Sequence, residues 1–317
     1  MPDAVRIASE VADAVAEGRP VVALESTLLA HGLPAPDNRE VAAELEETVR
    51  AGGAVPATVA VLDGVAVVGL SPAELDRVCA GGLTKLSRRD LGVALGLGLD
   101  GATTVASTAL LARLAGIAVF GTGGLGGVHR GARESWDVSA DLAVLADTPV
   151  LVVCSGVKSL LDVPATLEQL ETLSVPVISF GTDAFPGFYR RDSGWRAPWR
   201  VDDPAMAAEV ATAHWALGAA SGLVLANPVP AAAELDPELH DRVLAEALAL
   251  AGERGVRGRD VTPMLLDYFH TATGGASLVC NVALVRSNVA LAARVAAALT
   301  PAAAGGQSAM TQPVRAR

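Results

Sequence analysis

The sequence PVLVVCSGVKSLLD, residues 149–162, contains an expected strand, a tight turn and the approach to a helix. Its apolar run Val150–Cys154 is continuous rather than alternating, which is typical of a parallel strand covered on both faces. Similar runs occur at Val21–Glu25, Thr58–Leu62, Val65–Gly69, Ile117–Gly121, Pro176–Phe180 and Gly222–Ala226. Helical patterns lie between them, at about 4–17, 39–51, 72–79, 103–115, 159–173, 204–218, 237–252, 260–272 and 277–299. This alternation predicts a three-layer α/β/α fold with a largely parallel central sheet.

We expect a single domain over residues 1–300, followed by a disordered tail at 301–317. The dipeptide Asp63-Gly64, between two apolar runs, predicts an antiparallel hairpin. The segment FPGFYRRDSGWRAP, residues 185–198, is rich in aromatic and arginine side chains. We interpret it as a functional loop rather than a linker.

Charge and composition exclude several classes of protein. A net charge of −11 and a pI near 4.9 argue against a nucleic acid polymer as partner, although a few local donors can still hold one phosphate. The three cysteines, Cys79, Cys154 and Cys280, are too scattered for a disulfide framework and fit reduced thiols in the cytoplasm. The first residues lack the apolar core of a signal peptide, and the apolar runs are too short or too interrupted to predict a membrane span.

Glu25 directly follows the apolar run VVAL, so it falls at the carboxyl end of a predicted strand. Ligand crevices of α/β sheets form at that edge. A partly desolvated Glu there would have a raised pKa and could act as a general acid. A helix-capping or ion-paired glutamate explains the same position equally well.

A glycine-rich segment, GTGGLGGVHRG at 121–131, follows the predicted strand Ile117–Gly121. Such a segment lets the backbone approach a ligand and aim N–H groups at a phosphate, with Thr122, His129 and Arg130 as side-chain candidates. Gly121, Gly123 and Gly126 also satisfy the dinucleotide-binding pattern G-x-G-x-x-G. We discount that alternative because His-Arg-Gly follows where an apolar helix is needed; an ordinary surface turn stays open.

The segment Asp137-Val-Ser-Ala-Asp141 places two carboxylates around a hydroxyl. These hard oxygen ligands suit Mg²⁺ or Mn²⁺ better than zinc. A helix N-cap with two acids in its first turn is the common alternative.

Lys158 follows the strand and the Ser-Gly turn, where the predicted helix is about to begin. Desolvation and the positive end of a helix would both favour a neutral amine, which can attack a carbonyl and form an imine. A surface lysine is the ordinary explanation. However, the chain has only one other lysine, Lys85, against twenty-two arginines, which indicates a need for an amine.

Taken in order, these segments resemble the pseudouridine-5'-phosphate glycosidase family, also described as indigoidine-synthase A-like, from about residue 5 to 298. The resemblance rests on ALESTLLAHGLP (23–34), KLSRRDL (85–91), GATTVAST (101–108), GTGGLGGVHRG with WDVSADL (121–142), CSGVKSLLD (154–162), SFGTDAFPGFYRRDSG (179–194), ANPVP (226–230) and TGGASLVCNVALV (273–285). It implies reversible cleavage of pseudouridine 5'-phosphate to uracil and ribose 5-phosphate, a divalent metal, usually Mn²⁺, and a homotrimer.

The resemblance also assigns roles. Glu25 matches the proton donor, Lys158 the nucleophile that forms an imine with ring-opened ribose, and Asp137 the metal ligand. The implied substrate-binding residues are Lys85, Val105, Ser139, Ala140, Asp141 and Asn281, the last of them near uracil. Thr122 and His129 of the glycine-rich segment complete the expected substrate-binding set. The phosphate is expected near the glycine loop, His129 and Lys85.

Two other functions stay open. The same site could run forward as a C-nucleotide synthase that joins ribose 5-phosphate to a different base. More remotely, the chain could be a non-catalytic protein that binds nucleotide phosphates. Arg133, Trp136 and Ala276 depart from the family pattern, and we expect them near the determinants of base specificity.

Overall fold

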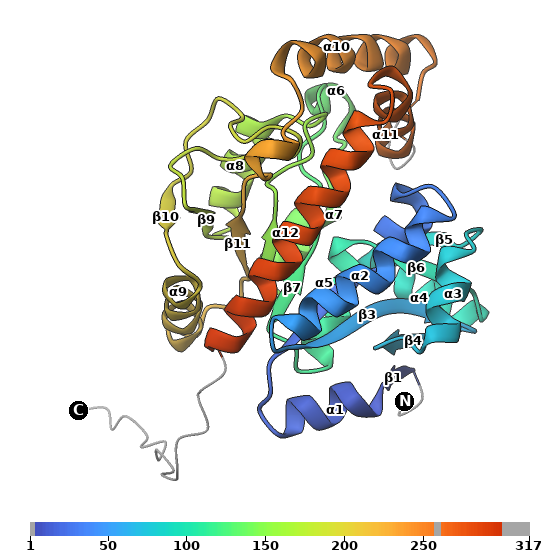
Figure 1. Ribbon diagram of the computed structural model, residues 1–317, viewed down its shortest axis with the longest axis vertical. Helices are drawn as coiled ribbons and strands as arrows, with labels where there is room; N and C mark the ends of the chain where they lie inside the picture. The colour runs from blue at the N-terminus through green and yellow to red at the C-terminus, as the bar shows by residue number, and fades with distance from the viewer. Residues whose placement is uncertain (1–3, 257–260, 300–317) are drawn as a thin grey trace.

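Figure 1 shows a computed structural model of the chain, which describes residues 4–256 and 261–299. The tail predicted at 301–317 lies outside the described residues.

Within the described residues, eleven strands form one sheet with parallel pairing throughout, except where β3 meets β4 and β6. The strands are β1 (Val5–Ile7), β2 (Val21–Glu25), β3 (Val55–Leu62), β4 (Val65–Val68), β5 (Thr84–Leu86), β6 (Gly101–Thr103), β7 (Val119–Gly121), β8 (Leu151–Cys154), β9 (Val177–Phe180), β10 (Trp199–Val201) and β11 (Leu223–Ala226). The main path runs β1-β4-β3-β2-β7-β8-β11-β9-β10, and β6 pairs with β3 and β5 beside it.

Helices cover both faces of the sheet, as the predicted layering requires. They are α1 (Ser9–Ala16), α2 (Asp37–Ala51), α3 (Pro72–Cys79), α4 (Arg88–Leu97), α5 (Val105–Leu114), α6 (Ala132–Ser135), α7 (Ala140–Leu145), α8 (Val163–Thr172), α9 (Pro204–Ala216), α10 (Pro237–Glu253), α11 (Val261–Ala272) and α12 (Ala276–Leu299), with a π-helix η1 (Leu28–Gly32) and a 3₁₀ turn η2 (Ala231–Ala233). α12 packs with α2 and α9 in one layer, and α5 packs with α4 and α7 in the other.

The long helix α12 runs across the front of the sheet in Figure 1 and contacts β2, β7 and β8. It is the one helix in the described part of the chain that is long and apolar enough to cross a membrane. Buried residues such as Leu284, Val289 and Ala292 pack it into the hydrophobic core. These contacts are those of a core helix.

Two predicted helices differ from the structure. The helix expected over 4–17 is instead a short strand, β1, followed by α1, because Val5–Ile7 pairs in parallel with β4 and forms the edge of the sheet. The helix expected over 159–173 begins only at Val163, where the Asp162 side chain accepts the N–H of Ala165 and a proline occupies the first turn. The positive end of a helix therefore does not lie at Lys158, and the expectation from the sequence is wrong on this point. The antiparallel hairpin around Asp63-Gly64 is confirmed.

Three neighbouring parallel strands, β2, β7 and β8, position the chemistry at their carboxyl ends. Leu24 pairs with Gly121, and Gly121 pairs with Val153. Glu25 follows Leu24 and Thr122 follows Gly121, so these two residues emerge side by side at the carboxyl edge of the sheet, where α/β folds form ligand sites.

Candidate active site

Glu25 ends β2 in a partly buried position beside the glycine loop. Its Oε1 accepts a hydrogen bond from the Thr122 hydroxyl. Burial raises the pKa of Glu25, while the Lys158 ammonium and the Thr122 hydrogen bond act in the opposite direction. A carboxyl group with a raised pKa can hold a proton at a pH where an exposed glutamate has lost it.

Lys158 lies on the loop after β8, and that loop is bound to the glycine loop. The backbone N–H of Lys158 donates to the carbonyl of Leu125 at 3.2 Å, and the N–H of Leu125 donates to the carbonyl of Gly156 at 2.9 Å. Gly156 has a φ of +75°, and a Cβ there would lie 2.0 Å from the carbonyl oxygen of Pro186. Only glycine therefore allows this turn, which fixes the position of the lysine.

The Asp141 carboxylate links the glycine loop to the start of α5 through hydrogen bonds. One carboxylate oxygen accepts the N–H of Gly126 at 2.8 Å, and the other accepts the N–H of Ala106 at 3.0 Å. A Cβ on Gly126 would lie 2.2 Å from the Ser139 hydroxyl oxygen, so the loop packs closely on that segment. Asp141 lines the site, yet both of its oxygens already bind backbone groups.

The dinucleotide-binding alternative does not fit this geometry. The glycine loop leads through the isolated β-bridges of Leu125, Val128 and His129 rather than into a long helix, and α6 has only four residues. The fold that uses G-x-G-x-x-G needs a helix N-terminus at the loop.

Asn288 is a site residue that the sequence reasoning missed. Its side chain is fully buried on α12, and its amide donates to the carbonyls of Thr122 (2.8 Å) and Gly123 (3.2 Å) and to the Ser155 hydroxyl (3.1 Å). Its oxygen accepts from the amide of Asn227 at 3.0 Å. One side chain thus ties the start of the glycine loop to the loop that carries Lys158. The sequence does carry a signal for it: Asn281 and Asn288 are seven residues apart, on one face of an apolar helix.

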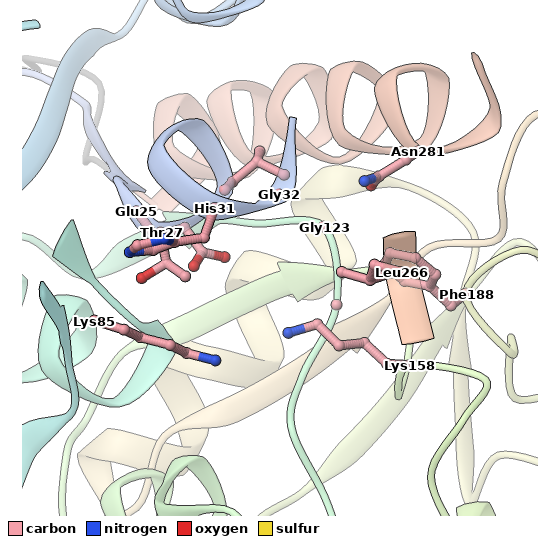
Figure 2. A pocket seen from close by; sticks show the side chains of 12 residues that line it. Glu25, Thr27, His31, Gly32, Lys85, Gly123, Lys158, Phe188, Leu266 and Asn281 are labelled. Atoms are coloured by element: carbon pink, nitrogen blue, oxygen red, sulfur yellow. The ribbon is translucent and has the colours of Figure 1, made fainter. Parts of the chain in front are cut away.

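Two cavities meet at the candidate catalytic groups. The inner cavity has an empty volume of about 500 Å³ and the side cavity one of about 1110 Å³. Both are lined by Glu25, Thr27, Lys85 and Lys158. Figure 2 shows the side chains of the two lysines pointing toward one another from two segments of the chain. A ligand that spans both cavities would therefore place its central atoms between Glu25 and Lys158.

The side cavity combines cationic side chains with the carboxyl groups of Glu25, Asp137 and Asp141. Lys85, Arg89 and His129 line it, together with the predicted residues Val105, Asp137, Ser139 and Ala140. Burial lowers the pKa of His129, opposed by the neighbouring Asp137 carboxylate, whose Oδ2 lies 3.7 Å from Nδ1. Arg89 is not among the predicted site residues, although it lies within the motif KLSRRDL.

The inner cavity has a more apolar wall, made by Phe188 and Leu266, with Asn281 and His31 at its rim. Asn281 is only 4% exposed, and its Oδ1 has no hydrogen-bond partner among the described residues. Thr27 and His31 are not among the predicted site residues, although both lie in the motif ALESTLLAHGLP.

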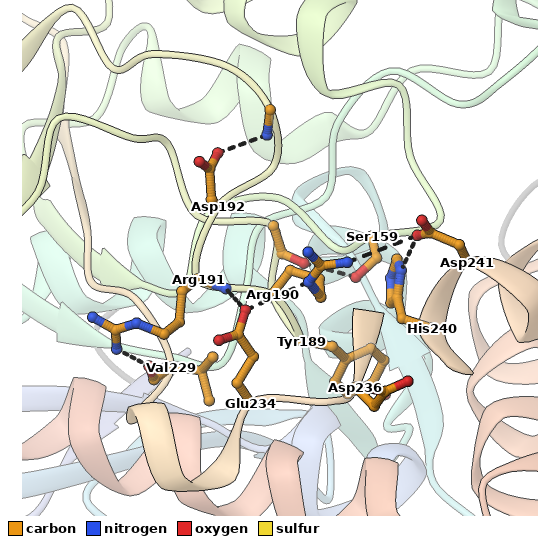
Figure 3. A network of polar contacts seen from close by, with 12 residues as sticks. Ser159, Tyr189, Arg190, Arg191, Asp192, Val229, Glu234, Asp236, His240 and Asp241 are labelled. Atoms are coloured by element: carbon orange, nitrogen blue, oxygen red, sulfur yellow. Dashed lines mark hydrogen bonds and ion pairs between the residues drawn. The ribbon is translucent and has the colours of Figure 1, made fainter. Parts of the chain in front are cut away.

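Phe188 comes from the segment 185–198 that the sequence analysis interprets as a functional loop. It has a φ of +62°, and its N–H donates to the carbonyl of Ser155 at 2.9 Å. The arginines of this loop brace it rather than line the cavities: Arg190 pairs with Glu234, and Arg191 donates to the carbonyl of Val229 (Figure 3). The loop therefore serves the inner cavity through Phe188.

The three departures from the family pattern lie away from the cavities. Trp136 is 86% exposed, Arg133 and Ala276 are also exposed, and none of them lines the inner or the side cavity among the described residues. Base specificity is better sought at His31, Leu266 and Asn281.

The site offers a metal ion the carboxylate of Asp137 rather than a full set of protein ligands. Within residues 4–256 and 261–299, no group of three or more His, Cys, Asp or Glu side chains is arranged to hold a metal. Asp137 lines the side cavity beside His129, whereas the oxygens of Asp141 are already in use. A single carboxylate fits Mg²⁺ or Mn²⁺ that keeps several waters and is completed by substrate oxygens.

Comparison with known proteins identifies the family. Residues 10–298 match the family described as Indigoidine synthase A like protein. The chain belongs to this family. Its curated relatives include a protein from Frankia alni (57% identical, covering 92% of this chain and 81% of the relative) and one from Streptomyces griseus subsp. griseus (57% identical, covering 93% and 92%). Both are named pseudouridine-5'-phosphate glycosidase.

Two solved structures of similar proteins share the fold. The prealnumycin C-glycosynthase AlnA, solved in complex with ribulose 5-phosphate, has a TM-score of 0.87 at 39% identity, over 93% of this chain and 97% of AlnA. An indigoidine synthase A (IdgA)-like protein from Thermotoga maritima has a TM-score of 0.86 at 35% identity, over 95% and 98%. The mostly parallel α/β fold of the indigoidine synthase A-like family is thus found in all three.

Proposed function

We propose that the chain catalyses the reversible reaction of pseudouridine 5'-phosphate with water to give uracil and ribose 5-phosphate. The observation that carries this proposal is that a partly buried carboxyl group, Glu25, and an amine, Lys158, line the same two adjoining cavities. The names of the curated relatives support the same reaction.

The chemistry of the bond explains why these two groups are needed together. A C–C glycosidic bond has no leaving heteroatom to protonate, so a pair of carboxylates is not sufficient. Opening of the ribose ring lets the amine of Lys158 attack C1' and form an imine, which serves as an electron sink. Glu25 then delivers a proton to C5 of the departing uracil, and water hydrolyses the imine to release ribose 5-phosphate and the free lysine.

Lysine is a better candidate for the nucleophile than the nearby cysteine. Cys154 lies at the end of β8, and burial raises its pKa to about 12, so the thiol stays protonated.

The phosphate of the substrate fits the side cavity. Lys85, Arg89 and the N-terminus of α5, at Thr104 and Val105, all line it. Positive side chains and the first N–H groups of a helix both favour a phosphate. The base then occupies the inner cavity, between Phe188 and Leu266 and within reach of Asn281.

A divalent cation would be held by Asp137, with the phosphate or sugar oxygens of the substrate completing its shell. Bound there, Mn²⁺ or Mg²⁺ would polarise a substrate oxygen as a Lewis acid. Two observations support this assignment: Asp137 lines the side cavity, and its Oδ2 lies 3.7 Å from Nδ1 of His129.

Borohydride trapping tests the lysine assignment. Purified protein is incubated with ribose 5-phosphate and sodium borohydride, and its peptides are mapped by mass spectrometry. We expect a reduced sugar adduct on Lys158 and none in Lys158→Arg, whose guanidinium forms no imine. Lys85→Arg is the matched control and should retain an adduct on Lys158. A sugar adduct confined to Lys85 would contradict the assignment.

A second function has support from AlnA, which is named a C-glycosynthase and holds a five-carbon sugar phosphate. In this alternative the site joins ribose 5-phosphate to a base other than uracil. Turnover with other aromatic carbon acids, together with failure with uracil in both directions, would favour the synthase.

We also propose a cytoplasmic homo-oligomer, a trimer by family resemblance. The exposed apolar side chains of Val93 (57%) and Leu97 (68%) on α4 support self-association. Sedimentation of the native protein against Leu97→Glu tests this, since a charge on a buried interface should shift the mass toward the monomer.

A further inference from the structure

A third cavity adjoins the inner cavity, and Lys158 is not among the residues that line it. This outer cavity has an empty volume of about 630 Å³. It shares His31, Gly32, Leu266 and Asn281 with the inner cavity, so the two spaces adjoin across these residues. Figure 2 places Asn281 and Leu266 on the far side of the inner cavity from Lys85. A molecule bound with its reacting carbon at Lys158 would therefore reach the outer cavity only through its remote edge.

Two buried polar atoms on the wall of the outer cavity have no hydrogen-bond partner among the described residues. They are Oδ1 of Asn281 and Nδ1 of His270. A buried polar atom without a partner is unfavourable unless a ligand or a water completes it. Asn281 also lines the inner cavity. Of these two unpartnered groups, His270 is therefore the one that lines the outer cavity and not the inner one.

The remaining wall combines apolar side chains with the polar groups of Asp267 and Ser277. Leu33, Leu278 and Tyr189 line it, and Tyr189 is buried and stacked on Phe269 with ring centroids 5.4 Å apart. Such a wall suits a short carbon chain or a fused ring, and His270 suits a hydroxyl or carbonyl at its end. Uracil has neither a carbon chain nor a second ring, and its two carbonyl groups lie directly on its single ring.

We propose that the outer cavity receives a substituent on the base, on the edge remote from the bond to ribose. The inference rests on the proposed function. It extends the substrate class to C-nucleotides whose base is larger than uracil and ends in a polar group. The reaction is otherwise unchanged: the base carbon loses its proton, C1' of ribose 5-phosphate gains the new C–C bond, and one water is released.

The test uses matched acceptors. Native protein is incubated with ribose 5-phosphate, Mn²⁺ and either uracil, N1-propyluracil or N1-(2-hydroxyethyl)uracil, with the N3 isomers in parallel, and C-nucleotide products are quantified by mass spectrometry. We expect uracil and at least one hydroxyethyl isomer to react with kcat/KM values within about tenfold of one another. Turnover of uracil alone would overturn this inference and leave the proposed function standing. Turnover of none of the acceptors would overturn both.

Two variants separate a binding site from an entrance. Leu278→Trp fills the outer cavity, and we expect it to lower kcat/KM for the substituted acceptors at least about tenfold while uracil changes less than about threefold. An equal loss with every acceptor, in a protein with native melting temperature, would make the cavity a mere entrance and contradict the proposal. His270→Leu should selectively impair the hydroxyethyl acceptor relative to the propyl one; equal effects on the two would also contradict it.

Discussion

Replacing Asn288 with alanine removes a side chain that joins the glycine loop to the loop carrying Lys158. The native amide makes hydrogen bonds to Thr122, Gly123, Ser155 and Asn227, with distances of 2.8–3.2 Å for those it donates and 3.0 Å for the one it accepts from Asn227. At about 1 kcal/mol for each lost bond, and more where a buried partner stays unpaired, the loss in unfolding free energy should be about 3–5 kcal/mol. That is a large share of the stability of an ordinary domain.

The matched control is Asn281→Ala, seven residues earlier on the same helix face. Asn281 is also buried, but its Oδ1 has no partner among the described residues. We therefore expect Asn281→Ala to change the unfolding free energy by less than about 1 kcal/mol, because little hydrogen bonding is lost. Urea unfolding followed by tryptophan fluorescence measures both variants. Equal losses in the two variants would refute the hydrogen-bond reasoning.

Activity adds a readout that a purely structural residue would not move. Without Asn288 the carbonyl of Thr122 loses its anchor, so the Thr122 hydroxyl should hold Glu25 less well. In Asn288→Ala we expect kcat to fall more than KM rises, and the alkaline limb of the pH profile to move to higher pH. An unshifted pH profile would restrict Asn288 to stability.

Further variants test the electrostatics and the turn. Burial raises the pKa of Glu25 above its value in the unfolded chain, so the carboxyl group contributes less to the unfolding free energy as the pH rises from the unfolded to the folded pKa. Glu25→Gln should therefore be at least as stable as the native protein at neutral pH. Its kcat should fall at least about 10²-fold because the proton donor is lost. Thr122→Val removes a hydrogen bond that lowers this pKa, so the alkaline limb of kcat should move to higher pH; a shift to lower pH would contradict the assignment. Gly156→Ala forces a Cβ against the Pro186 carbonyl at positive φ and should cost more than about 2 kcal/mol in urea unfolding. Gly92→Ala and Gly96→Ala, in open space on α4, should instead raise stability by up to about 1 kcal/mol each, which thermal unfolding detects.

The strands beneath the site can be predicted because their signal is local. Buried parallel strands leave continuous apolar runs, and β2 occupies Val21–Glu25 as expected from the sequence. The residue that ends such a run must emerge at the carboxyl edge, which is why Glu25 is recognisable from the amino-acid order alone. Short elements give no such signal: β6 has three residues, Gly101–Thr103, and α4 carries two glycines in an exposed helix, so local propensity alone does not define them.

The loops that complete the site depend on contacts distant in sequence. Asn288 lies 166 residues from Thr122 and 133 from Ser155, so no local pattern reports their hydrogen bonds. The start of α8 is a different case. Asp162 and the nearby proline are readable in the sequence as a cap, and this signal outweighs the expectation of a helix beginning beside Lys158.

The residues proposed for catalysis and those proposed to contact the base come from different parts of the fold. Glu25 ends strand β2 and Lys158 lies on the loop that follows β8, and Asn288 holds that loop to the glycine loop through hydrogen bonds to Thr122 and Ser155. The wall that would face the base comes instead from η1, the 185–198 loop and α11, through His31, Phe188 and Leu266. None of these wall residues hydrogen-bonds to Glu25 or Lys158 within the described part of the chain. Substitutions in that wall can therefore change which base is accepted while the imine chemistry stays intact, so a change of base preference is expected to require fewer substitutions than a change of reaction.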